Sequence, residues 1–205
     1  MTTENTVLMS MARDSLRGKW GIAIGTFLLY SIIMGAFGAM RAAGVIALII
    51  AGPMMLGAAI FSLNISRDHE LKVEQIFQGF NNFSTALVTY LLMVLYIFLW
   101  SLLLIIPGII AALSYSMSFY ILSEEPELKA SEVLQRSKEM MDGYKLKLFG
   151  LYMLFLLLGI ACIFTLGIGF LWLIPFAHVT TAKFYEDIKA ASLEDVNLFS
   201  EEEIV

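Results

Sequence analysis

The stretch "SLLLIIPGIIAALSY", residues 101–115, decides the fold because it places a Pro-Gly pair inside a long apolar segment. No charged residue occurs between Glu74 and Glu124. The apolar part, residues 84–122, would be about 58 Å long as one helix at about 1.5 Å per residue. A hydrocarbon core about 30 Å thick needs only about 20 residues per crossing. Because proline removes a backbone donor and glycine adopts turn dihedrals, we predict that Pro107 and Gly108 form a turn joining two transmembrane helices.

The composition of the whole chain also indicates a lipid environment. The 205 residues are 59% apolar and only 15% charged, and the mean hydropathy is +0.80. Soluble domains carry about 25% charged residues, and a core of this size cannot hide so much apolar surface. We predict one membrane domain over residues 1–185, followed by an acidic cytoplasmic tail over 186–205 that we expect to be solvated and disordered.

The same length argument divides the rest of the chain into spans. The sequence predicts an all-α polytopic membrane protein with six transmembrane helices arranged as three hairpins. Pro53 and Pro175 fall inside the second and sixth spans, where proline kinks a helix. The predicted spans are residues 20–40, 42–65, 84–106, 107–122, 146–165 and 170–185.

A short amphipathic helix is expected before each hairpin. Apolar residues recur at helical spacing over residues 5–17, 72–78 and 130–142, which makes one apolar face. Such a face next to a span is expected in the headgroup region. Gly18, Gly79 and Gly143 are predicted to stop these helices. The order of in-plane helix, span, turn and span occurs three times, which suggests a structural repeat.

The basic residues predict the orientation. All of the 13 Lys and Arg residues except Arg41 fall on the side of the predicted membrane that holds both termini. Because basic residues stay in the cytoplasm, we expect a bacterial cell-membrane protein with both termini cytoplasmic. An odd number of spans would scatter these charges over both faces.

Four polar residues inside the spans are candidates for a functional role. His178 shares a helix face with Thr181, which suits either a proton or ligand contact or a histidine bonded to a neighbouring helix. Ser114 and Ser118 are four residues apart in the fourth span. Small hydroxyl residues there favour close helix packing, with a polar lining for a substrate path as the alternative.

Four segments resemble a known family. They are "ARDSLRGKW" (12–20), "LWSLLLIIPGIIAALSYSMSFYIL" (99–122), "SKEMMDGYKLKLF" (137–149) and "TLGIGFLWLIPF" (165–176). They are similar to the bacterial multi-pass membrane family catalogued as domain of unknown function 975. The resemblance implies a small polytopic protein without established activity or catalytic residues. The chain departs from it at Tyr152, where an acidic residue is expected in many members.

Composition and motifs narrow the possible functions. The net charge of −5 and the lack of a basic stripe argue against nucleic-acid binding, and we expect no metal, cofactor or enzymatic activity. Ionisable groups inside a membrane usually mark ion-coupled sites, and the predicted spans contain almost none. We therefore predict a non-enzymatic envelope component that interacts with lipids, a protein partner or a second copy. The alternative is a small transporter or channel subunit for an amphipathic substrate.

Overall fold

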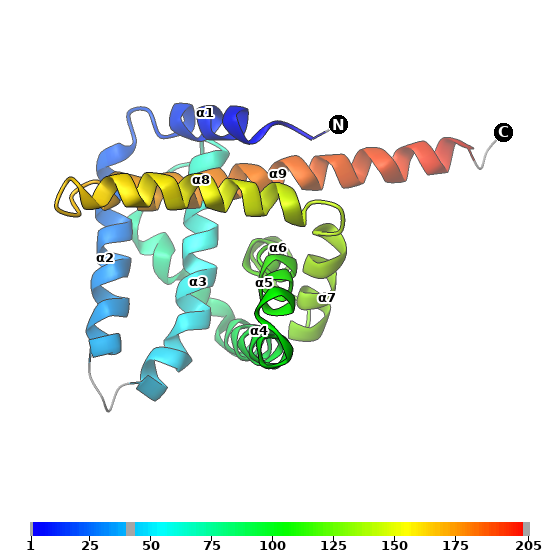
Figure 1. The fold of residues 1–205 in the computed structure, drawn as a ribbon, viewed down its shortest axis with the longest axis horizontal. Coiled ribbons are helices and arrows are strands. Elements are labelled where there is room, and N and C mark those ends of the chain that lie inside the picture. Colours follow the sequence, from blue (N-terminus) through cyan, green and yellow to red (C-terminus); the bar gives the residue numbers. More distant parts are fainter. Residues whose placement is uncertain (1, 40–43, 203–205) are drawn as a thin grey trace.

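The computed structural model describes residues 2–39 and 44–202, and every element in those ranges is a helix (Figure 1). Arg41, the basic residue expected on the outer side, lies outside the described residues. The elements are α1 (Asn5–Ser15), α2 (Trp20–Ala39), α3 (Gly44–Ser66), the 3₁₀ helix η1 (Val73–Asn82), α4 (Phe83–Leu103), α5 (Ile105–Ser114), α6 (Ser118–Glu124), α7 (Ala130–Met140), α8 (Lys145–Ile163) and α9 (Phe170–Glu202).

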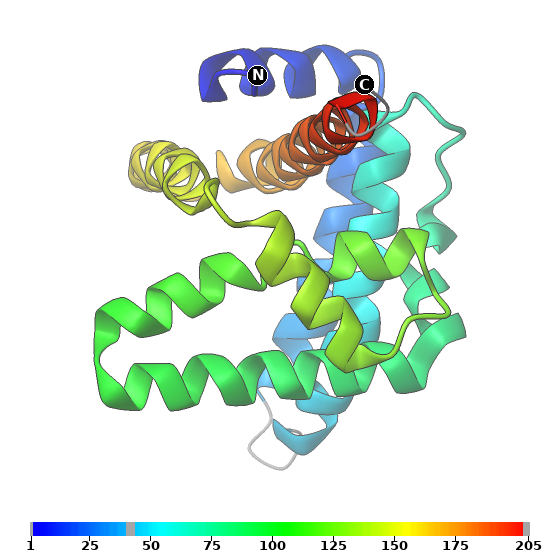
Figure 2. The ribbon, with the colours of Figure 1, turned by 90° about the vertical axis from the view of Figure 1, so that its right-hand side faces the viewer.

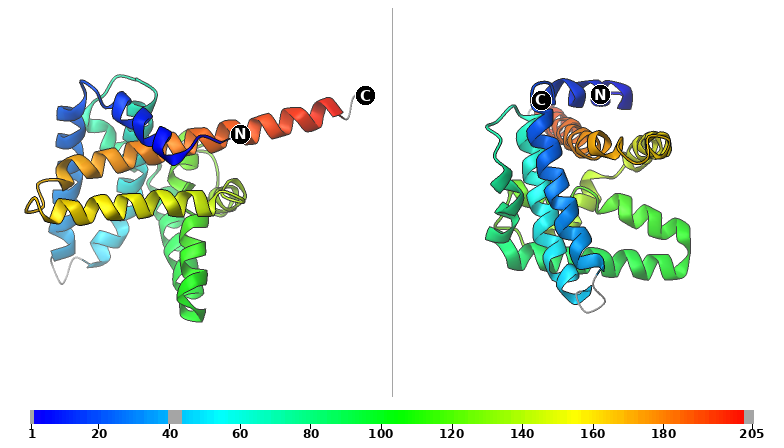
Figure 3. Two further views of the ribbon diagram at one scale, coloured as in Figure 1. Left: turned by 45° about the horizontal axis from the view of Figure 1, so that its top comes forward. Right: turned by 90° about the vertical axis from the view of Figure 1, so that its left-hand side faces the viewer.

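The long helices contact one another in consecutive pairs that run in different directions. α2 and α3 lie side by side, and α8 and α9 run across them (Figure 1). α4 and α5 extend away from the rest of the molecule and meet at their far ends (Figures 2 and 3). Trp20 at the start of α2 and Thr165 in the α8–α9 turn line the same groove. The predicted topology puts these two residues on opposite membrane faces, so the third pair does not run alongside the first in this structure.

Four helical segments are long and apolar enough to cross a membrane: Ile46–Ser66, Val73–Leu103, Ile105–Glu124 and Lys145–Ile163. A fifth candidate arises if α1 and α2, which meet at 102°, count as one bent span. The apolar beginning of α9 ends at Lys183, which leaves fewer than the about 20 residues that a span needs. The described residues therefore give four to five candidate spans, fewer than the six expected.

The chain turns just before the Pro-Gly pair rather than at it. Leu104 is extended, with φ −164° and ψ 155°, and α5 begins at Ile105. Pro107 falls in the first turn of α5, where its missing N–H has no intrahelical partner to lose. A Cβ added to Gly108 would lie 2.1 Å from Ser101 Oγ. Gly108 thus lets α5 approach α4 closely, and Leu104 is the turn residue.

The three predicted helix-stop glycines differ from one another. Gly18 and Gly143 follow α1 and α7 and have φ of +75° and +78°, the left-handed conformation that ends many helices. Gly79, in contrast, lies buried inside η1 and does not end it. A Cβ at Gly79 would lie 1.9 Å from the carbonyl oxygen of Pro53. Close approach of two backbones, rather than a helix stop, requires glycine there.

α3 packs closely on η1 and on the start of α4. A Cβ added to Gly57 would lie 1.8 Å from the Ile76 carbonyl oxygen, and one added to Gly52 would lie 2.3 Å from that of Ala86. Glycine at these positions of α3 lets the helices touch through their backbones, as in many membrane helix contacts. Pro53 lies inside α3 between them, and Pro175 lies inside α9.

The short amphipathic helices α1 and α7 bury part of their apolar faces against other helices of the same chain. Leu8 and Ala12 of α1 are buried, as are Val133 and Leu134 of α7. α1 contacts α3, α8 and α9, whereas α7 contacts α4, α5, α6 and α9. Protein therefore covers part of each face, whereas Val7 and Met11 of the apolar face of α1 are 43% exposed. The predicted disordered tail also differs, because α9 continues as a helix to Glu202.

Candidate functional site

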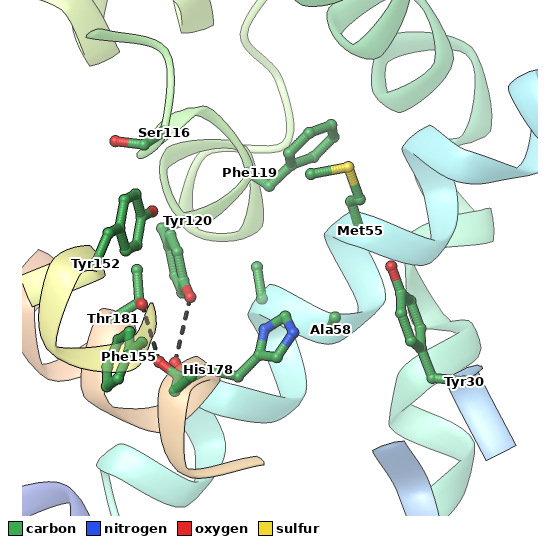
Figure 4. A pocket seen from close by; sticks show the side chains of 12 residues that line it. Tyr30, Met55, Ala58, Ser116, Phe119, Tyr120, Tyr152, Phe155, His178 and Thr181 are labelled. Atoms are coloured by element: carbon green, nitrogen blue, oxygen red, sulfur yellow. Dashed lines mark hydrogen bonds between the residues drawn. The ribbon is translucent and has the colours of Figure 1, made fainter. Parts of the chain in front are cut away.

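A central cavity of about 320 Å³ lies where the pairs α2–α3 and α8–α9 meet α6. Its lining comes from α2, α3, α6, α8 and α9 and from the residues between α5 and α6 (Figure 4). Its volume falls at the lower end of the about 300–1,000 Å³ that small-molecule sites occupy. Segments far apart in the sequence thus enclose one space at the centre of the fold.

His178 of α9 is the titratable imidazole in this cavity. Its ring stacks on Phe27 at 4.5 Å between centroids and meets Tyr30 edge-on at 6.5 Å. Its backbone carbonyl accepts a hydrogen bond of 3.4 Å from the Tyr120 hydroxyl (Figure 4). Among the described residues, none hydrogen-bonds to the ring nitrogens. The imidazole is held by aromatic contacts, which leaves its polar atoms available to a bound molecule.

The other polar groups of the cavity are hydroxyls. Thr181 donates to the Ala177 carbonyl at 2.9 Å, and Ser116 donates to the Leu113 carbonyl at 2.7 Å. Aromatic and apolar side chains complete the wall: Met55, Phe119, Tyr120, Tyr152 and Phe155. The described residues of the lining include no aspartate, glutamate, lysine or arginine, and Tyr152 stands where the family resemblance implies a carboxylate. The cavity therefore suits a neutral amphipathic molecule better than an ion.

The structure brings together two of the four candidate residues. His178 and Thr181 both line the cavity, as their shared helix face implies. Ser114 and Ser118 do not line it; both are buried, and their hydroxyls donate to the carbonyls of Ile110 and Tyr115. The helix they were expected to share is broken, since α5 ends at Ser114 and α6 begins at Ser118. Ser116, between them, faces the cavity instead.

Ser137 of α7 bridges the break between α5 and α6. Its hydroxyl donates to the Ser114 carbonyl at 2.9 Å and accepts from the Met117 backbone N–H at 3.2 Å. Ser137 is fully buried, and buried backbone groups require such partners. A hydroxyl from the amphipathic helix α7 therefore stabilises the irregular backbone that carries Ser116 to the cavity wall.

Charged side chains gather around α9 beyond the cavity. Arg67, just after α3, forms ion pairs with Glu124 at the end of α6 and, at 2.9 Å, with Glu186 of α9. Lys189 of α9 binds Glu124 at 2.5 Å. We call these residues, together with Lys147 and Asp187, the charged cluster. It ties the ends of α3, α6 and α8 to one segment of α9.

Asp187 connects this cluster to the N-terminus. It accepts hydrogen bonds from the Thr3 backbone N–H at 3.0 Å and from Lys147 Nζ at 2.6 Å. Burial alone would raise the pKa of Asp187, but the bonds from Lys147 and Thr3 outweigh burial and hold that pKa below its ordinary value. The carboxylate therefore stays ionised and anchors residues far apart in the sequence.

Comparison with known proteins identifies the family of the chain but no activity. The family described as "Protein of unknown function (DUF975)" matches residues 1–109 and 102–192. The chain belongs to this family. The DUF975 match includes all the residues that line the central cavity and those of the charged cluster. No curated protein and no solved structure matches the chain.

Sequence reasoning missed most of the cavity wall. Tyr30, Tyr120 and Tyr152 stand in different helices of this DUF975 chain, and nothing in their local sequence relates them. Ser116 lies between the two candidate serines in the sequence, but helical spacing pairs Ser114 with Ser118 and leaves Ser116 out. Within the described residues, side chains able to ligate a metal do not gather in groups of three or more.

Proposed function

We propose that this chain is a non-enzymatic, multi-pass membrane protein that binds a lipid or another amphipathic molecule within the bilayer. The observation that carries the membrane assignment is the apolar surface of the paired helices. Leu102 and Ile105 near one turn are 74% and 78% exposed, and Phe164 and Leu166 at another are 87% and 94% exposed. Soluble proteins rarely expose contiguous apolar patches of this kind.

The proposal includes six crossings in three hairpins, with both termini in the cytoplasm of a bacterial cell. The charged cluster supports it, because the ends of α3, α6, α8 and α9 that are predicted to be cytoplasmic are joined there by ion pairs. Lys19 before α2 likewise pairs with Asp68 after α3. Because α8 and α9 run across α2 and α3 (Figure 1), six crossings require the third pair to change its tilt in a bilayer.

The chemistry of the central cavity supports binding rather than catalysis. General acid–base catalysis needs a titratable group positioned against the reacting bond. His178 has aromatic neighbours and no carboxylate among the described residues of the lining. An apolar and aromatic wall with a few hydroxyls is typical of ligand sites. Binding of a protein partner or a second copy is compatible with the same membrane domain.

Filling the cavity is expected to weaken binding of a neutral amphipathic probe. Ala177 lines the cavity, whereas Ala112 of α5 is exposed on the outer surface. Ala177→Phe should reduce the affinity for the neutral fluorophore N-phenyl-1-naphthylamine about tenfold, which corresponds to about 1.4 kcal/mol. Ala112→Phe adds the same side chain outside the cavity and should leave the affinity unchanged. Fluorescence titration in neutral detergent measures both.

Equal affinity in the two folded variants would contradict binding in the cavity. His178→Gln provides a second variant that changes the polarity of the wall without adding volume. It should weaken binding of probes that hydrogen-bond, and a folded H178Q protein with unchanged affinity for an indole probe would argue against the imidazole contact. Thermal melting establishes that each variant is folded.

A small transporter is the second candidate, and the broken helix favours it. Discontinuous helices next to a central site are common in transporters, and the break between Ser114 and Ser118 borders the cavity through Ser116. Pro175 interrupts the hydrogen-bond ladder of α9 ahead of His178. Protein-dependent efflux of the probe from vesicles would support transport. Binding of the probe without efflux would contradict transport and support the binding role.

A further inference from the structure

A second hollow, separate from the central cavity, lies where the start of α2 meets the α8–α9 turn. This groove has a volume of about 460 Å³. Its lining includes Leu158, Ala161 and Leu173 of α8 and α9, which we call its floor, together with Trp20 and Trp172. The linings of the groove and of the central cavity share no residue, although both draw on α8 and α9.

The lining of the groove is amphipathic in a specific way. Among its described residues, Arg13 is the one with a charge, and the remainder are apolar or aromatic apart from Thr165 and Cys162. Arg13 is exposed on α1, and within the described part of the chain no carboxylate pairs with it. Arg17, one turn further along, pairs with Asp14 at 3.3 Å. Among the side chains that the structure describes, Arg13 is therefore a cation without a carboxylate partner beside an apolar groove.

We propose that this groove binds an anionic phospholipid, with the phosphate on Arg13 and an acyl chain along the floor formed by α8 and α9. The proposal rests on the membrane location proposed above and on the arrangement of α8 and α9 against the start of α2 that the structure shows, not on six crossings, and it adds a site and a lipid class. A planar guanidinium binds phosphate oxygens in a bidentate manner. Tryptophans such as Trp20 and Trp172 occur where headgroups meet acyl chains. A free polar anion bound to Arg13 would leave the apolar floor uncovered, which argues against such an anion as the sole occupant.

The chain carries its own reporter for this groove. Cys162, the single cysteine of the sequence, lines it and is partly exposed. An acyl chain on the floor would cover the thiol and slow its alkylation. Because no other thiol exists in the chain, the rate of labelling by N-ethylmaleimide reports on this position alone.

The test measures Cys162 labelling in purified full-length protein in neutral detergent with added lipid. Phosphatidylglycerol should slow labelling at least threefold, whereas phosphatidylcholine and inorganic phosphate should not. Arg13→Gln should abolish protection by phosphatidylglycerol, and Arg17→Gln, which removes an equal charge in the turn just after the same helix, should retain it. The lipid phosphorus that remains bound after gel filtration gives an independent readout and should fall in R13Q but not in R17Q.

Each other outcome has a defined meaning. Equal protection in R13Q and R17Q, or equal protection by phosphatidylcholine, would overturn the anionic-lipid site. Protection by inorganic phosphate alone would show an anion contact without a lipid and would also overturn it. Thermal melting of both variants controls for a merely structural effect of Arg13 near the end of α1. Vesicle flotation separates the two proposals: protein that fails to float contradicts the membrane function, whereas floating protein without selective protection contradicts this site alone.

Discussion

Gly57→Ala is expected to lower the free energy of unfolding by about 1–3 kcal/mol, the range for overpacking a tight contact. The added Cβ would lie 1.8 Å from the Ile76 carbonyl oxygen and 2.6 Å from its carbon. Both are backbone atoms of η1, so no side-chain rotation relieves the overlap. α3 and η1 must therefore separate, which also disturbs the Gly79 contact with Pro53. Unfolding by a denaturing detergent, followed by circular dichroism, measures the change.

Gly25→Ala is the matched control for this prediction. Gly25 also lies inside a long helix, α2, but a Cβ there would meet nothing within 4 Å. Alanine favours a helix over glycine by roughly 0.5–1 kcal/mol, so this variant should be as stable as the wild type or slightly more stable. If the G57A and G25A proteins had the same free energy of unfolding, the close backbone contact between α3 and η1 would be contradicted.

Ser137→Ala is expected to destabilise the protein by about 1–3 kcal/mol, because it leaves buried backbone groups without partners. The Ser114 carbonyl and the Met117 N–H both bond to the Ser137 hydroxyl across the break between α5 and α6. Alanine has nearly the same volume and therefore isolates the loss of the hydroxyl. Loss of this bridge should also loosen the backbone around Ser116 and weaken probe binding in the central cavity.

Ser131→Ala on the same helix serves as the control. Ser131 is exposed near the start of α7, so its replacement should change stability by less than about 0.5 kcal/mol. Thermal melting and hydrogen exchange around residues 114–118 are the measurements. An S137A protein that has the same melting temperature as S131A and unchanged hydrogen exchange at residues 114–118 would contradict the bridging role of Ser137.

Local features of the fold could be predicted from the sequence. The amphipathic helices and the helical membrane character follow from apolar periodicity and length, and Gly18 and Gly143 do lie after α1 and α7 with positive φ. The turn predicted at Pro107 lies three residues earlier, at Leu104. Proline is tolerated in the first turn of a helix as readily as in a turn, and sequence alone does not distinguish the two.

Features that depend on long-range packing could not be predicted. Gly79 resembles a helix stop in sequence, but the approach of Pro53 decides its role. Ser114 and Ser118 show perfect helical spacing, yet the helix breaks between them because Ser137, on another helix, satisfies the freed backbone. His178 and Thr181 share a helix face whatever their neighbours, which is why the sequence predicts that they lie together, as they do in the cavity wall.

The central claim, that lipid covers the long apolar helices, is tested most directly by nitroxides in vesicles containing the purified protein. In a Cys162→Ser background, labels at Leu102→Cys and Leu156→Cys report on α4 and α8, where the native leucines are 74% and 54% exposed. A label at Glu127→Cys reports on the charged segment between α6 and α7. We predict that oxygen relaxes the labels at residues 102 and 156 far more than a water-soluble nickel chelate does, with the reverse at residue 127. Equal access of the nickel chelate to all three positions would mean that water surrounds these helices, and would contradict the account.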